Sequence, residues 1–224
     1  MPRTARIAPA GTVFHVLNRG VGRMQLFGKD RDYEAFEAMI EKTLQSRPMR
    51  ICAYCLMPNH WHFVLWPERE GQLGDFMQKL AVTHVRNWQE HHRRVGYGHV
   101  YQGRYKSFPV ETEDYFYRVV RYVERNALRA SLVRRAGDWR WGSLWRRTCG
   151  AREKMAWLSD WPAPRPRDWL SLVDEPQTEA ELEAIRRSVT RSQPYGSEAW
   201  VWKTARDLGL ESTLRARGRP RESK

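Results

Sequence analysis

The sequence has few cysteines, no long apolar run and too few acidic residues to balance its bases. Its 224 residues include three cysteines, an odd number that does not suggest a disulfide framework. No apolar run approaches the length of a membrane span, and the first residues lead into no apolar core of the kind that signal peptides have. We therefore expect a soluble cytoplasmic protein that a packed core stabilises.

Positive charge is the strongest bias of the composition. Lysine and arginine number 39 against 26 aspartate and glutamate residues, which gives a net charge of +13. This balance favours a polyanionic partner over a small metabolite, and nucleic acid is the first expectation. Eleven tryptophans and nine tyrosines add stacking surface for unpaired bases, although most such rings belong to hydrophobic cores.

The order of the expected elements predicts one α+β domain followed by an extension. Apolar patterns favour strands near residues 12–18, 50–56, 62–66 and 105–111, helices near 30–47 and 72–91, and a third helix capped by Thr112. This order predicts an antiparallel sheet with helices mainly on one face. The predicted divisions are the domain, 1–148, a partly helical Trp- and Pro-rich extension, 149–214, and a basic flexible tail, 215–224. Within the extension we expect helices near 178–191 and 197–208.

The most informative motif covers residues 57–62, with the sequence Met-Pro-Asn-His-Trp-His. Side chains alternate between the two faces of a strand, so His60 and His62 point the same way while Trp61 points into the opposite layer. Two imidazoles on one face form a platform for a metal ion. A lone His-x-His pair is more often structural than a ligand pair, so the interpretation depends on a second motif.

That second motif lies in the third helix. Tyr122 and Asn126 are four residues apart, so they lie on one face of an α-helix. Tyr115 and Tyr117 have no amide side chain one turn later, which makes Tyr122 the candidate nucleophile. A strand with two histidines that faces this helix would join a metal site to an oxygen nucleophile.

Together these residues resemble the HUH single-tyrosine transposases of bacterial insertion sequences, and more closely the REP-associated tyrosine transposases. The supporting segments are residues 14–20, 53–62, 98–107 and 122–126, which occur in the family's order over roughly the first 145 residues. At Ala127 and Ser131 the family commonly has proline and glycine. These departures adjust a helix end and leave the chemistry intact.

The resemblance implies a ferredoxin-like fold and metal-dependent transesterification on single-stranded DNA that carries a hairpin, as REP sequences do. It implies that His60, His62 and Asn126 bind Mg²⁺ or Mn²⁺, and that Tyr122 attacks phosphorus to form a 5′-phosphotyrosine. Such a transposase would act on the bacterial nucleoid, as a monomer or a homodimer.

Basic residues near these motifs are candidates for contacts with DNA. Arg19, Arg104 and Lys106 lie in the family-like segments and are the better candidates for phosphate contacts. The tail could be a DNA-tracking arm or a solubilising segment. Its arginines are Arg215, Arg217, Arg219 and Arg221.

Two other functions remain open at this point. A domesticated regulator could bind the hairpin without cutting, although binding alone places no demand on all four candidate site residues. A zinc-stabilised nucleic-acid module could use Cys52 and Cys55 with the two histidines. An offset of three in a strand puts the two sulfurs on opposite faces, so we expect buried apolar cysteines instead. His15 is likewise expected to pack in the sheet.

Overall fold

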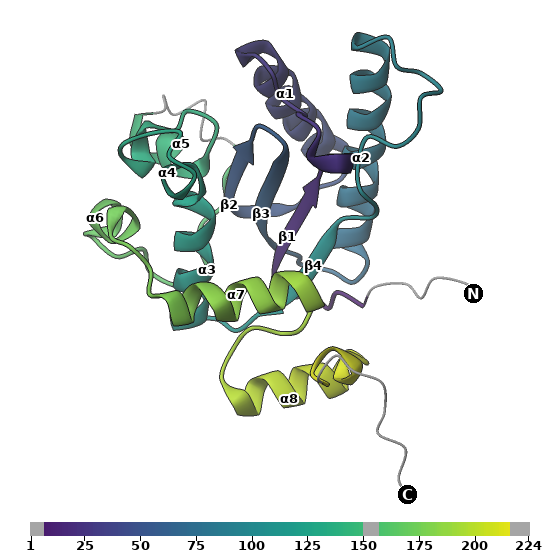
Figure 1. The fold of residues 1–224 in the computed structure, drawn as a ribbon. Coiled ribbons are helices and arrows are strands. Elements are labelled where there is room, and N and C mark those ends of the chain that lie inside the picture. Colours follow the sequence, from purple (N-terminus) through teal and green to yellow (C-terminus); the bar gives the residue numbers. More distant parts are fainter. Residues whose placement is uncertain (1–6, 150–156, 216–224) are drawn as a thin grey trace, which may run out of the picture.

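A four-stranded antiparallel sheet lies at the centre of the protein (Figure 1). The computed structural model describes residues 7–149 and 157–215. The strands are β1 (Val13–Arg19), β2 (Arg50–Met57), β3 (His60–Trp66) and β4 (Lys106–Val110), in the order β2-β3-β1-β4. Helix α1 (Asp30–Ser46) joins β1 to β2, and α2 (Gln72–His91) joins β3 to β4. This ferredoxin-like order confirms the predicted α+β class.

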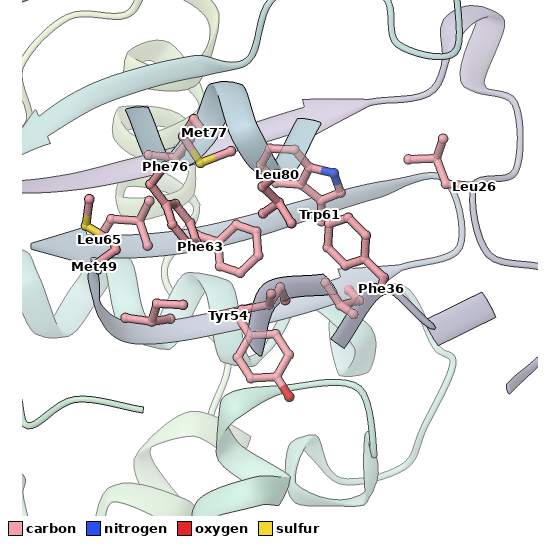
Figure 2. Packing of buried hydrophobic residues seen from close by; sticks show 14 of the residues in the cluster. Leu26, Phe36, Met49, Tyr54, Trp61, Phe63, Leu65, Phe76, Met77 and Leu80 are labelled. Atoms are coloured by element: carbon pink, nitrogen blue, oxygen red, sulfur yellow. The ribbon is translucent and has the colours of Figure 1, made fainter. Parts of the chain in front are cut away.

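One face of the sheet packs against α1 and α2 (Figure 2). Both helices carry apolar residues at the spacing of one helical face, as the sequence predicted. Phe36 of α1, Phe76 and Leu80 of α2, and Trp61 and Phe63 of β3 are fully buried between them. Full burial of a large apolar side chain stabilises the fold by about 1.5–3 kcal/mol, so this layer anchors β3 firmly.

Helix α3 (Asp114–Glu124) covers the opposite face, so the expectation of helices mainly on one face is wrong for this helix. Its residues Phe116, Val119 and Val123 pack with Val64 of β3 and Phe108 of β4. The reason is that the strands are apolar on both sides: every residue of β2 after Arg50 is buried. A sheet of this kind must be covered on both faces.

The two ends of α3 differ from the expectation in detail. Thr112 is not its cap; Glu113, with φ of 67°, precedes the first helical residue, Asp114. At the other end the helix stops at Glu124, and the short α4 (Asn126–Arg129) follows. Arg125 between them keeps φ of −81° and ψ of −2°, so the chain continues almost as a helix.

Further helices partly share the core beneath α3. Helix α5 (Ser143–Cys149) lies at the end of the predicted domain, and the extension adds α6 (Trp169–Asp174), α7 (Glu179–Arg191) and α8 (Glu198–Asp207). Short 3₁₀ turns lie at Val21–Arg23 and Ala136–Asp138 in the domain and at Glu211–Thr213 in the extension. The two helices predicted near 178–191 and 197–208 are confirmed. Trp169, Val173 and Ile185 belong to the core cluster that contains α3. Among the described residues, no helix has the length and apolar character of a membrane span.

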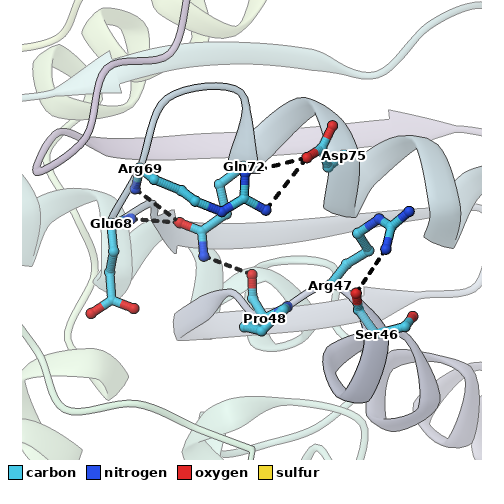
Figure 3. Close-up of polar contacts among 7 residues, drawn as sticks. All are labelled: Ser46, Arg47, Pro48, Glu68, Arg69, Gln72 and Asp75. Carbon is cyan, nitrogen blue, oxygen red and sulfur yellow. Dashed lines mark hydrogen bonds and ion pairs between the residues drawn. The ribbon is translucent and has the colours of Figure 1, made fainter.

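Gln72 links the turn before α2 to the turn after α1 (Figure 3). Its Oε1 atom accepts hydrogen bonds from the backbone N–H groups of Glu68 and Arg69, at 2.6 and 3.2 Å. Its Nε2 atom donates to the carbonyl oxygen of Pro48 at 2.8 Å. These bonds satisfy backbone groups that would otherwise be unpaired near the start of α2. They also hold the start of α2 to the segment that follows the end of α1.

A buried carboxyl group connects α3 to the extension. Glu124 accepts a hydrogen bond from the Ser143 hydroxyl at 2.6 Å and one from the Trp169 indole N–H at 2.7 Å. Burial raises the pKa of this carboxyl above its usual 4.5, against the opposing effect of the two hydrogen bonds.

Glu124→Gln should therefore change how stability depends on pH. Because the folded pKa is raised, the folded protein keeps a proton that the unfolded chain releases above pH 4.5, and the free energy of unfolding falls as pH rises through the folded pKa. Glutamine removes the ionisable group and keeps an acceptor oxygen, so the free energy of unfolding of Glu124→Gln should fall less than that of the parent over the same pH range. Urea unfolding of parent and variant at about pH 5 and about pH 8 measures the difference. Parallel changes in the two proteins would contradict the raised pKa.

Candidate active site

Strand β3 and helix α3 bring the predicted histidines and tyrosine together. His62 is buried on the side of the sheet that faces α3, and its ring centre lies 5.9 Å from that of Tyr122, edge to face. The His60 ring centre lies 5.0 Å from that of His62. Trp61 belongs to the opposite core, so the predicted alternation along β3 is confirmed.

The three tyrosines of α3 have different surroundings. Tyr115 packs against the ring of Tyr195 at 5.3 Å, and the Tyr117 hydroxyl donates to the carbonyl oxygen of Pro164 at 2.6 Å. Both therefore contact the extension. Of the three, Tyr122 is the one whose ring contacts His62.

His15 of β1 is a site residue that sequence reasoning placed only in the sheet. Its Nε2 atom lies 2.9 Å from Nδ1 of His62, so one ring donates a hydrogen bond to the other. The two rings are stacked at 5.0 Å. The contact follows from the strand order: Leu17 lies opposite His62 in the β1–β3 ladder, which puts His15 diagonally across from it on the same face.

A hydrogen bond defines the tautomer of His60. Its Nδ1 atom is 2.6 Å from Oδ1 of Asn59, whose amide nitrogen donates to the carbonyl oxygen of Arg23 at 3.3 Å. Since Oδ1 can only accept, His60 carries its proton on Nδ1 and keeps the lone pair of Nε2 free. A metal-ligating histidine is held in this way, with one ring nitrogen donating and the other available.

All three histidines are held neutral. Burial lowers the pKa of His60 to about 4 and that of His15 to about 3, and it holds the pKa of His62 well below 6.5. The positive charges of Arg19 and Arg129 lower the pKa of His60 and His62 further. Neutral imidazole is the form that binds a metal ion.

Asn126 contacts a residue that the sequence analysis did not select, Arg129. The buried Asn126 accepts a hydrogen bond on Oδ1 from Nη2 of Arg129 at 3.0 Å. The guanidinium carbon of Arg129 lies 4.1 Å from the centre of the Tyr122 ring. Arg129 is seven residues after Tyr122, two helical turns further on, so the spacing was an available signal.

Of the predicted DNA contacts, Arg19 lies beside the histidines, because it is opposite His60 in the β1–β3 ladder. Lys106 is the first residue of β4 and Arg104 precedes this strand; both side chains are exposed.

Arg215 is not brought to this site. Its carbonyl oxygen accepts a hydrogen bond from Nη2 of Arg191, the last residue of α7. In Figure 1, α8, which precedes Arg215, lies on the far side of α7 from the sheet. The other predicted tail residues lie outside the described residues and are Arg217, Arg219 and Arg221.

Cys52 and Cys55 are buried, as expected, but they do not lie on opposite faces of the sheet. The β2–β3 register shifts between Ile51 and Ala53, so Cys52 is an extra, bulged residue. The bulge reverses the alternation, and both Cys52 and Cys55 face the core beneath α3 rather than opposite sides. They are buried, as expected, and burial raises the pKa of each thiol to about 12, so both stay protonated.

No three His, Cys, Asp or Glu side chains within residues 7–149 and 157–215 are grouped as a metal site. This holds for the four residues of the zinc alternative, Cys52, Cys55, His60 and His62, among these described residues. The candidate metal ligands are two imidazoles and an amide, a set that contains no carboxylate or thiolate.

The comparisons define the class of the protein. The chain matches the family described as "Transposase IS200 like" over residues 11–126, more than half of its length. It therefore belongs to the IS200-like transposase family, and this membership implies a DNA-binding enzyme of transposition. Members of the family use a divalent metal ion.

A solved structure supports the fold. The "Structure of the REP associates tyrosine transposase bound to a REP hairpin" matches with a TM-score of 0.50 and 19% sequence identity, over 73% of this chain and 92% of that chain. At this identity the likeness shows the fold alone. No curated protein matches the chain at a significant level.

The histidine pKa values lead to a direct prediction for the metal-free protein. The rings of His15 and His60 should stay neutral to below about pH 5, because their midpoints lie at about 3 and about 4. The unfolded chain binds these protons near pH 6.5, so the free energy of unfolding should fall as pH drops below that value. Long-range ¹H–¹⁵N spectra follow each ring directly. A midpoint near 6.5 for either ring would contradict the description of this site.

Proposed function

We propose that this protein is a tyrosine transesterase that cuts and rejoins single-stranded DNA beside a hairpin. The observation that carries the proposal is the position of Tyr122 next to the neutral pair His60 and His62. A nucleophilic oxygen beside two imidazole donors fits phosphoryl transfer at a metal-activated phosphate. Hairpin binding without cutting makes no use of this arrangement.

In the proposed reaction the Tyr122 oxygen attacks a phosphodiester of the bound strand. The Oη–P bond forms and the P–O3′ bond breaks, which leaves a 5′-phosphotyrosine. The phenol loses a proton, and the departing 3′ oxygen takes one up. Attack by a 3′-hydroxyl on the phosphotyrosine reverses these steps and rejoins DNA, so strand transfer needs no external energy source.

The residues fit a divalent ion such as Mg²⁺ or Mn²⁺. His60 would bind it through the free lone pair of Nε2, and His62 would do so with its proton on Nδ1, donated to His15. Asn126 has a second lone pair on Oδ1 beside the one that Arg129 occupies. The ion would supply polarisation of the phosphate and stabilisation of the leaving oxygen.

The charge around these ligands favours an anionic substrate. Two arginines, Arg19 and Arg129, act on His60, and no carboxylate contributes to its shifted pKa. A divalent ion in so positive a site needs the substrate phosphate as a further ligand. The site is thus better suited to a metal–phosphodiester pair than to a metal ion alone.

The proposed substrate is a single strand with a REP-like hairpin. The solved structure that shares the fold holds a REP hairpin, and the +13 charge of this chain favours a polyanion. Arg19, Arg104 and Lys106 are the proposed phosphate contacts near the site. The arginines of the tail would add contacts further along the strand. The proposed domain spans residues 1–148, and it would act as a monomer or a homodimer.

Tyr122→Phe should abolish formation of the covalent protein–DNA adduct. The substitution removes the attacking oxygen and keeps the ring, so folding and hairpin affinity should match the parent. The assay combines a 3′-labelled hairpin-bearing single strand with Mg²⁺ or Mn²⁺, and peptide mass mapping identifies the residue that holds the 5′ phosphate.

Tyr115→Phe is the matched control, because Tyr115 lies on the same helix and packs against the extension. It should form adduct at the parent rate. An adduct that persists in Tyr122→Phe, or that maps to Tyr115, would mean that the wrong tyrosine was chosen. Cleavage without any adduct would indicate hydrolysis, and hairpin binding by the parent without cleavage would indicate a regulator.

His60→Ala should stop cleavage while hairpin affinity stays within about severalfold of the parent, because the imidazole is proposed to bind the ion and not the DNA. EDTA should have the same effect on the parent. His99→Ala is the control, since His99 is an exposed histidine. Unchanged cutting in EDTA or by His60→Ala would exclude the proposed metal site.

A further inference from the structure

Arg129 is a cation without a counterion among the described side chains. It is half-buried, and none of the ion pairs between described residues includes it. Its Nη1 atom is shielded from solvent and makes no hydrogen bond to any described residue. Charged groups are seldom buried unless a partner compensates them, so the missing partner requires an explanation.

The guanidinium group is held in place by the proposed catalytic residues themselves. Its carbon lies 4.1 Å from the centre of the Tyr122 ring, and its Nη2 atom donates to Oδ1 of Asn126 at 3.0 Å. The first contact sets the side chain over the ring and the second sets its rotation. Nη1 is left as a fixed donor beside the nucleophile.

Two neighbouring donors are also without partners. The side-chain nitrogen Nδ2 of Asn126 and Nε of Arg19 are shielded from solvent and make no hydrogen bond within the described chain. Arg19 lies opposite His60 in the β1–β3 ladder, and both Arg19 and Arg129 act electrostatically on His60 and His62. Unused donors on two arginines that act on one histidine pair, with a third on Asn126 beside Arg129, suit an anion with several acceptor oxygens.

We propose that Arg129 is a further catalytic residue, which binds a non-bridging oxygen of the phosphate that Tyr122 attacks and keeps it bound in the phosphotyrosine. The inference rests on the proposed function and names a residue for it. A planar guanidinium can stack on the tyrosine and donate to phosphate from a fixed position in its own plane, whereas a lysine ammonium has no planar face to stack and its donors rotate. A donor fixed in advance at the site of developing charge stabilises the transition state more than the bound substrate.

The test compares Arg129→Gln with Arg86→Gln, which removes the same charge from an exposed ion pair with Glu90 on α2. Arg129→Gln should bind the hairpin strand within about threefold of the parent and form the covalent adduct about 100- to 1,000-fold more slowly. Arg86→Gln should match the parent in both. Adduct formation by Arg129→Gln within about threefold of the parent rate would overturn the proposal.

Chemical rescue separates catalysis from a structural role. Added guanidinium ion should restore part of the adduct rate of Arg129→Ala, because the free ion can occupy the vacated position beside Tyr122. It should leave Arg86→Ala unchanged. If the glutamine and alanine variants do not fold, Arg129→Lys decides: at least about a tenfold loss of rate supports the role, and a parental rate overturns it.

A second measurement does not depend on cleavage. Inorganic phosphate is titrated into the metal-free and DNA-free protein. It should shift the ¹⁵N-detected side-chain signals of Arg129 in the parent and in Tyr122→Phe. Its affinity for Arg129→Gln should be at least about tenfold weaker than for the parent. If the parent forms no adduct with DNA, the proposed function fails, and the phosphate titration still decides whether Arg129 is an anion site. Equal phosphate affinity of parent and Arg129→Gln would overturn the assignment to Arg129.

Discussion

The burial of both faces of the central sheet is the constraint on which the candidate site depends. Strands β2 and β3 are apolar on the two sides, so α1 and α2 cover one face and α3 must cover the other. Trp61 fixes β3 from the first side through full burial. On the second side, the packing of α3 sets Tyr122 against His62. The residues proposed for the chemistry are thus positioned by the same burial that stabilises the fold, and they stand on a strand and a helix rather than on loops.

Electrostatics adapts this location to a particular chemistry. Burial and two nearby arginines keep the histidines neutral, which is the state that ligates a metal ion. The same arginines leave the site positive. In the proposed reaction the transferring phosphate would bring negative charge to these arginines and to the metal ion. The bulge in β2 turns both Cys52 and Cys55 toward the core under α3, but their thiols stay protonated, and a protonated thiol is not the form that ligates a metal ion.

Those parts of the site that depend on local periodicity could be predicted from the sequence. The shared face of His60 and His62 follows from alternation in a strand, and the pairing of Tyr122 with Asn126 follows from one helical turn. The contact of His15 with His62 could not be predicted in this way, because it depends on which strand neighbours β3. The side of the sheet that α3 covers and the bulge at Cys52 are likewise results of tertiary packing. Arg129 is an intermediate case. Its position two helical turns after Tyr122 could be predicted from the sequence, but its lack of a counterion among the described side chains could be found only from the structure.

The central claim is that metal ion, phosphate and nucleophile meet between β3 and α3. The most direct measurement is anomalous diffraction at the manganese edge from crystals of Tyr122→Phe grown with Mn²⁺ and an uncleaved hairpin-bearing single strand. The account predicts one manganese peak bonded to His60 and His62, with a phosphodiester oxygen as a further ligand and the ring of residue 122 beside that phosphate. Manganese held by the DNA alone, or a scissile phosphate remote from the two histidines, would contradict it.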